Sequence, residues 1–200
     1  MVFVVGLTGN IASGKTTAAK IFSGFGIEVI NADQISKELT IKDTPAYKKI
    51  VAHYGVDVLL ENKELDRKRL REIIFSQPSE RQWLENLLHP LIREQLEDRA
   101  NSCTTPYCVI EIPLLLDRKN YSYLNKILAI IAPKKLQVAR VMERDQCSEA
   151  QAMAILSTQP EDSARLKIAD DVIINDSGLD ALQHNLEILH HQYLNQINLM

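Results

Sequence analysis

The sequence predicts an α/β fold of three layers, in which a five-stranded parallel sheet carries helices on both faces. Five short apolar runs rich in Val and Ile alternate with segments of helical periodicity, as the buried strands of such folds do. The first run leads at once into a glycine-rich turn and then into a helix-forming segment. In chain order the runs are 2–7, 27–30, 108–112, 127–131 and 172–174.

The composition suits one globular domain. The 200 residues are 46% hydrophobic and carry a net charge of −3, which favours a sizeable core over an extended surface for nucleic acid or membrane. No apolar run approaches the roughly 20 residues of a membrane span, and the N-terminus enters a strand rather than a signal peptide. The cysteines Cys103, Cys108 and Cys147 lack metal-binding spacing, which indicates reduced thiols. We therefore expect a cytoplasmic protein.

The segment Gly9–Thr16 matches the phosphate-binding loop: a glycine, four residues, a second glycine, Lys, then Ser or Thr. Glycines allow a tight turn that aims backbone N–H groups at phosphate oxygens, and the following helix adds its positive end. Lys15 would contact the β- and γ-phosphates of ATP, and the Thr16 hydroxyl would ligate Mg²⁺. The expected nucleotide-binding residues are Asn10, Ile11, Ala12, Ser13, Gly14, Lys15, Thr16 and Thr17. The alternative is a glycine-rich turn without a ligand.

Carboxylates follow two of the predicted strands. Asp33 comes just after the second run, at the sheet edge where ligands of parallel sheets bind, and could accept the proton of an attacking hydroxyl. It could instead cap a helix over 34–39. After the third run, Glu111 could serve the metal or the substrate, and Asp117 could reach Mg²⁺ or cap a helix.

Three arginines lie in the predicted helices after the fourth run. Arg140 and Arg144 are four residues apart and share one helix face, and Arg165 follows. Guanidinium groups match phosphate oxygens, so we expect these side chains to contact ATP. The alternative is a solvated helix face paired with Glu143 or Glu161.

The pattern divides the chain into a core of about 1–33, 104–140 and 166–200, a helical insertion of about 34–103 and a helical lid of about 141–165. Helices are expected over 46–54 after Pro45, 67–75 capped by Asp66, and 80–88 capped by Ser79. His89-Pro90 should break the last of these before it resumes over 91–99. After the fourth run, helices are expected over 134–145, over 149–157 capped by Ser148, and from Pro160, with a final helix from near Gly178.

The chain lacks the guanine motif of GTPases and the signature of transport ATPases, which leaves a small-molecule kinase of nucleoside-monophosphate-kinase type. The sequence resembles the dephospho-coenzyme A kinase family along nearly its whole length. Residues 6–16 resemble the family's G-L-T-G-G-I-G-S-G-K-S, 31–33 its D-A-D, and 112–115 its I-P-L-L. The L-D-R at 65–67, the H-P at 89–90 and the A-D-D-V-I at 169–173 followed by Asn175 match further motifs.

The resemblance implies a P-loop kinase fold and transfer of the ATP γ-phosphoryl group to the 3′-hydroxyl of dephospho-CoA, the last step of CoA synthesis. It implies Lys15, Asp33 and Arg140 as catalytic residues, with Asp33 as the base. It implies Arg144 and Asn175 near ATP, and an acceptor site that includes Asp33, His89, Pro90, Glu111 and Leu115.

The departures from the family pattern are Asn10 and Ala12 in place of glycine, Asn31 in place of aspartate and Asp117 in place of glutamate. Two other classes stay open: a P-loop kinase for another acceptor, such as a nucleoside or sugar, and a nucleotide-binding switch without turnover.

Overall fold

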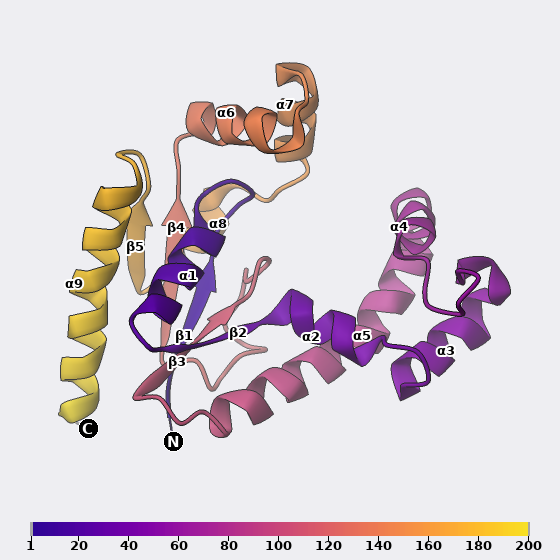
Figure 1. The fold of residues 1–200 in the computed structure, drawn as a ribbon, viewed down its shortest axis with the longest axis horizontal. Helices are drawn as coiled ribbons and strands as arrows, with labels where there is room; N and C mark the ends of the chain where they lie inside the picture. Colours follow the sequence, from indigo (N-terminus) through magenta and orange to yellow (C-terminus); the bar gives the residue numbers. More distant parts are fainter. Residues whose placement is uncertain (1, 200) are drawn as a thin grey trace. The chain divides into compact units, whose positions relative to one another are not determined.

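The computed structural model describes residues 2–199, and its centre is a sheet of five parallel strands in the order β2-β3-β1-β4-β5 (Figure 1). The strands are β1 (Phe3–Thr8), β2 (Glu28–Asn31), β3 (Tyr107–Glu111), β4 (Lys126–Ile131) and β5 (Asp171–Ile174). All five predicted strands are confirmed. β1 is central, so the loop that follows it starts at the middle of the sheet's carboxyl edge.

Helices α1 (Lys15–Gly24) and α9 (Leu179–Asn198) pack against one face of the sheet. Alternate residues of β1 and of its neighbours join buried residues of both helices in one apolar cluster, as the two-residue period of a strand requires. Figure 1 shows α9 running alongside β5 and α1. The strand residues of this cluster are Phe3, Val5, Leu7, Tyr107, Val109, Leu128, Ile130 and Ile173.

The opposite face is covered by the segment between β3 and β4 and by helix α8 (Asp162–Leu166). A Cβ on Gly6 would lie 2.8 Å from Leu124 and 3.2 Å from Leu115, so this face of β1 leaves no room for a side chain. Thr8 is on the same side and donates a hydrogen bond to the Pro113 carbonyl at 3.5 Å, and Arg165 of α8 donates to that carbonyl at 3.2 Å. The predicted helical cover on both faces is thereby confirmed.

The chain forms two compact units. The core unit comprises residues up to Asn31 and from Arg99 onward, and the helical unit comprises Ala32–Asp98. The helical unit contains α2 (Ala32–Leu39), α3 (Pro45–Tyr54), a 3₁₀ turn η1 (Val56–Val58), α4 (Arg67–Ser76) and most of α5 (Pro78–Asn101). Its own apolar cluster is formed by Tyr47, Ile50, Val58, Leu65 and Leu70, with Trp83, Leu84 and Leu87 of α5 packed against it.

Two of the three predicted helix starts in the helical unit are confirmed. Pro45 is the first residue of α3, preceded by Thr44 as the cap, and Asp66 accepts hydrogen bonds from two N–H groups of α4. The predicted Ser79 cap is wrong, because α5 already begins at Pro78. The expected break at His89-Pro90 is wrong, because α5 continues through Pro90. Packing on both sides holds the helix: Leu87 joins the apolar cluster, and Leu96 is fully buried.

In the predicted lid, α6 (Lys134–Asp145) and α7 (Glu149–Ser157) pack together. The predicted Ser148 cap is confirmed as a capping box, in which Ser148 and Gln151 bond each other's backbone N–H groups. The helix expected from Pro160 begins instead at Asp162, which leaves Pro160 and its carbonyl in the preceding loop. None of the helices within residues 2–199 has the length and apolar content of a membrane span.

Candidate active site

Segment 9–14 turns tightly between β1 and α1, and close packing fixes its shape. A Cβ on Gly9 would lie 2.5 Å from both the Ile130 carbonyl oxygen and Ser13 Oγ. Gly14 has φ +103°, and a Cβ there would overlap the Asn175 amide. Both glycines of the phosphate-loop pattern are therefore required by the backbone path.

Ala12 adopts a left-handed conformation, with φ 60°. The resembling family pattern has glycine at this position, and an L residue pays about 1–2 kcal/mol for such a φ. The Ala12 side chain packs with Ile11 against the apolar cluster of α6 and α7, which partly offsets this strain. The loop thus contacts helices α6 and α7 through these two side chains.

The strain at Ala12 gives a stability prediction. We expect Ala12→Gly to leave the free energy of unfolding unchanged or raise it by up to about 1 kcal/mol, because relief of strain slightly exceeds the added chain entropy. Urea denaturation measures this, with Ala139→Gly on the exposed face of α6 as the control, expected to lose about 1 kcal/mol. A loss above 1 kcal/mol for Ala12→Gly would show that methyl packing outweighs the strain.

Glu111 is the centre of the polar site at the end of β3. Its side chain is buried and accepts from Lys15 Nζ at 2.5 Å, from Thr16 Oγ1 at 3.3 Å and from Asn31 Nδ2 at 2.6 Å. The sheet register explains the gathering, because Glu111 lies opposite both Leu7 of β1 and Asn31 of β2. A lysine, a hydroxyl and a carboxylate therefore meet where the phosphate loop enters its helix.

Asn31 is a site residue whose role the sequence did not reveal. An aspartate at this position, as in the resembling motif, would place a second carboxylate beside the buried Glu111, whereas the amide donates to it. The only indication in the sequence was that asparagine stands here in place of the aspartate of the family motif.

Arg140 of α6 and Asn175, which follows β5, hold the loop in place. Arg140 donates to the Ala12 carbonyl at 3.1 Å and to the Asn175 carbonyl at 3.3 Å, and the buried Asn175 amide donates to the Ser13 carbonyl at 2.8 Å. These bonds give both residues a role in shaping the loop. Arg144 of the same helix is exposed and pairs with its neighbour Asp145 at 2.7 Å.

Asn10 and Arg165 form a second buried polar group beside the loop. Asn10 Nδ2 donates to the Asp162 carboxylate at 2.7 Å and to the Pro160 carbonyl at 3.2 Å. Arg165 is fully buried, and burial lowers the pKa of its guanidinium while Asp162 opposes that shift. Asn10 is not among the residues with positive φ, so its backbone does not require glycine. Asp162 carried no sequence signal.

The remaining predicted residues make none of the hydrogen bonds described above. Leu115 is fully buried beneath Gly6 and belongs to the core, and Asp117 is exposed and accepts from Asn120 at 3.4 Å. Thr17 follows Thr16 in α1. Asp33 is the second residue of α2 and is exposed, so it lies inside the helix rather than at the cap that was its alternative.

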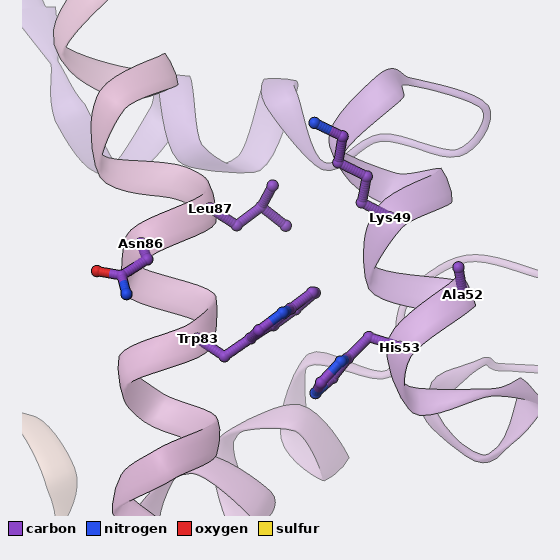
Figure 2. Close-up of a pocket in the computed structure, with 6 residues that line it drawn as sticks. All are labelled: Lys49, Ala52, His53, Trp83, Asn86 and Leu87. Carbon is purple, nitrogen blue, oxygen red and sulfur yellow. The ribbon is translucent and has the colours of Figure 1, made fainter.

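His89 and Pro90 are exposed on α5 in the helical unit. The same unit contains a cavity of about 510 Å³. Its lining residues come from α3 and α5 (Figure 2). The rings of Trp83 and His53 stack in it with centroids 3.8 Å apart, and His53 bonds Glu80 at 2.7 Å. The lining residues are Lys49, Ala52, His53, Trp83, Asn86 and Leu87. The cavity has the size of a small-molecule site.

A parallel five-stranded sheet, a glycine-bounded loop after its central strand, and a lysine and threonine at the start of the next helix define a P-loop kinase. A sequence profile described as "Dephospho-CoA kinase" matches residues 3–181. The chain belongs to the dephospho-CoA kinase family, and its function is that of a dephospho-CoA kinase, an ATP-dependent phosphotransferase.

Individual relatives are similar to this chain along nearly its full length. The dephospho-CoA kinase of Legionella pneumophila (strain Paris) is 56% identical over 98% of both chains. That of Coxiella burnetii (strain RSA 493 / Nine Mile phase I) is 45% identical over 95% of this chain and 96% of its own. The solved structure of dephospho-CoA kinase from Campylobacter jejuni superposes with a TM-score of 0.69 at 29% identity, covering 98% of this chain and 99% of that one.

Proposed function

We propose that this kinase transfers the γ-phosphoryl group of ATP to the 3′-hydroxyl of dephospho-CoA, with Lys15, Arg140 and Asp33 as the principal catalytic residues. The observation that carries the proposal is the convergence of Lys15, Thr16 and Asn31 on the buried Glu111 at the phosphate loop. We place this reaction in the cytoplasm, in keeping with three free cysteines.

Segment 9–17 fits the phosphates of ATP. The buried Ser13 hydroxyl has no hydrogen-bond partner among the described residues, and the loop begins a helix whose first N–H groups have no partner of their own. Lys15 places a positive charge on the β- and γ-phosphates, where negative charge develops in the transition state. Arg140 and Asn175 hold the loop in shape. Arg140 and Arg144 share one face of α6, and we expect their guanidinium groups to contact the ATP phosphates.

Thr16 and Glu111 are suited to Mg²⁺. Their side-chain oxygens are 3.3 Å apart, and hydroxyl and carboxylate oxygens are the donors that this ion prefers. Residues 2–199 contain no cluster of three or more His, Cys, Asp and Glu side chains that could hold a metal ion, which suits an ion held mainly by phosphates and water. When bound, Mg²⁺ neutralises phosphate charge.

Asp33 acts as the base for the acceptor. It follows β2 by two residues and is exposed in the first turn of α2, free of a capping role. Its carboxylate accepts the proton of the 3′-hydroxyl as that oxygen attacks the γ-phosphorus. The helical unit supplies the binding surface for the rest of the acceptor.

Substitution of His89 tests whether the acceptor binds at the helical unit. We expect His89→Ala to raise KM for dephospho-CoA about tenfold to a hundredfold, the loss of one hydrogen bond to a charged or ribose group, while KM for ATP changes little. Steady-state kinetics with each substrate varied in turn measures both constants. His184→Ala, a substitution in α9, is the matched control. Equal changes in the two constants would show that His89 only supports packing.

A further inference from the structure

The helical unit contains a second, more polar pocket beside the C-terminal half of α2. Its volume is about 230 Å³, below the usual size of a site for a whole small molecule, so it suits one group of a larger ligand. The pocket is lined by Gln34, Lys37, Glu38, Thr40, Ile41, Lys42, Glu64, Leu65 and Arg67.

Arg67 is held in place at this pocket. Its Nη2 donates to Thr40 Oγ1 at 2.9 Å and to the Lys37 carbonyl at 3.2 Å. Thr40 is buried, and its hydroxyl donates in turn to the Ser36 carbonyl at 2.8 Å. Both hydrogen bonds from Arg67 to described residues use Nη2, so the rest of its guanidinium, held in a fixed orientation, can bind an anion.

Cations outnumber carboxylates in the lining. Lys37, Lys42 and Arg67 supply three positive charges, and Glu38 and Glu64 supply two negative ones. Glu38 accepts from the Gln34 amide at 3.1 Å, which occupies part of its acceptor capacity. The pocket therefore combines donors and net positive charge in a space of restricted size, the properties of a phosphate-group site.

We propose that this pocket binds the diphosphate of dephospho-CoA. Lys37 lies four residues after Asp33 on α2, so the two side chains share a face about 6 Å apart along the axis. In the acceptor, the reacting 3′-hydroxyl and the 5′-diphosphate sit on one ribose, separated by a few bonds. Asp33 at the hydroxyl and Lys37 with Arg67 at the diphosphate would fix the acceptor by both ends of that ribose. This inference rests on the proposed role of Asp33.

The test uses charge changes of opposite sign in the full-length enzyme. We expect Lys37→Met to raise KM for dephospho-CoA about 3–10-fold and Arg67→Met about 10–100-fold, because Arg67 is the more rigidly held. Glu64→Gln should lower this constant about 2–5-fold. KM for ATP should stay within about twofold throughout. Lys68→Met, beside Arg67 but outside the pocket, should behave as the unchanged enzyme.

Adenosine as a competitive inhibitor completes the test, because it has the ribose but no diphosphate. Its inhibition constant should be the same for the unchanged enzyme and all four variants. An effect on adenosine as large as that on dephospho-CoA, or a Glu64→Gln variant with a raised KM, would overturn the diphosphate site. Failure of the unchanged enzyme to phosphorylate dephospho-CoA would instead overturn the proposed function, and titration calorimetry with dephospho-CoA would still report on the pocket.

Discussion

Replacement of Lys15 by alanine is expected to reduce kcat at least 10²–10³-fold, the cost of removing one preorganised charge or donor from a transition state. Lys15 meets Glu111 at 2.5 Å, and both side chains are largely buried. In phosphoryl transfer the protein contributes mainly position and electrostatic stabilisation, so this ammonium has no substitute. Steady-state rates measure the loss, and Lys20→Ala, an exposed lysine of the same helix, is expected to keep normal rates.

The same substitution threatens the fold, because it leaves a buried carboxylate without its cation, a change that costs about 3–5 kcal/mol in buried pairs. The double variant Lys15→Ala/Glu111→Gln removes that charge. We expect it to recover stability in a thermal melt without recovering turnover. A folded single or double variant with near-normal kcat would exclude Lys15 from the mechanism.

Asp33→Asn is expected to lower kcat about 10²–10⁴-fold, the usual contribution of a general base, with KM for ATP nearly unchanged. The amide keeps the shape of the side chain and loses only its basicity. Asp33 is exposed in the first turn of α2, so the free energy of unfolding should change by less than about 1 kcal/mol. Kinetics and urea denaturation on the same preparations separate the two effects.

Asp43→Asn is the control for Asp33, because Asp43 is an exposed carboxylate of the same unit whose positive φ asparagine tolerates. It should retain full activity. If kcat of Asp33→Asn were normal and only its stability fell, the residue would serve α2 and not the reaction.

The sheet was predictable because each strand is a short apolar run bounded by turn or helix signals, and the phosphate loop because its glycines and lysine have fixed spacing. The five strands and the helices α3, α4, α6 and α7 agree with prediction to within one or two residues. The caps Asp66 and Ser148 accept hydrogen bonds from backbone N–H groups two or three residues further along the chain. Such caps can therefore be predicted from the local sequence alone.

Local rules failed where distant contacts decide the structure. His89-Pro90 should end a helix by backbone sterics, yet α5 is continuous, with the partly buried Leu87 packed before it and the buried Leu96 after it. The hydrogen bond between Asn10 and Asp162 joins residues 152 positions apart. The partners of Glu111 meet through strand register, which a single sequence does not specify.

The most direct measurement of the central claim is the mass and the phosphorylation position of dephospho-CoA after incubation with the enzyme, ATP and Mg²⁺. Mass spectrometry should show the gain of one phosphoryl group with equimolar ADP, and nuclear magnetic resonance should place it on the 3′-oxygen. Adenosine and gluconate offered in parallel should react far more slowly. An unmodified dephospho-CoA beside a rapidly phosphorylated alternative acceptor, or ATP bound without any turnover, would contradict the account.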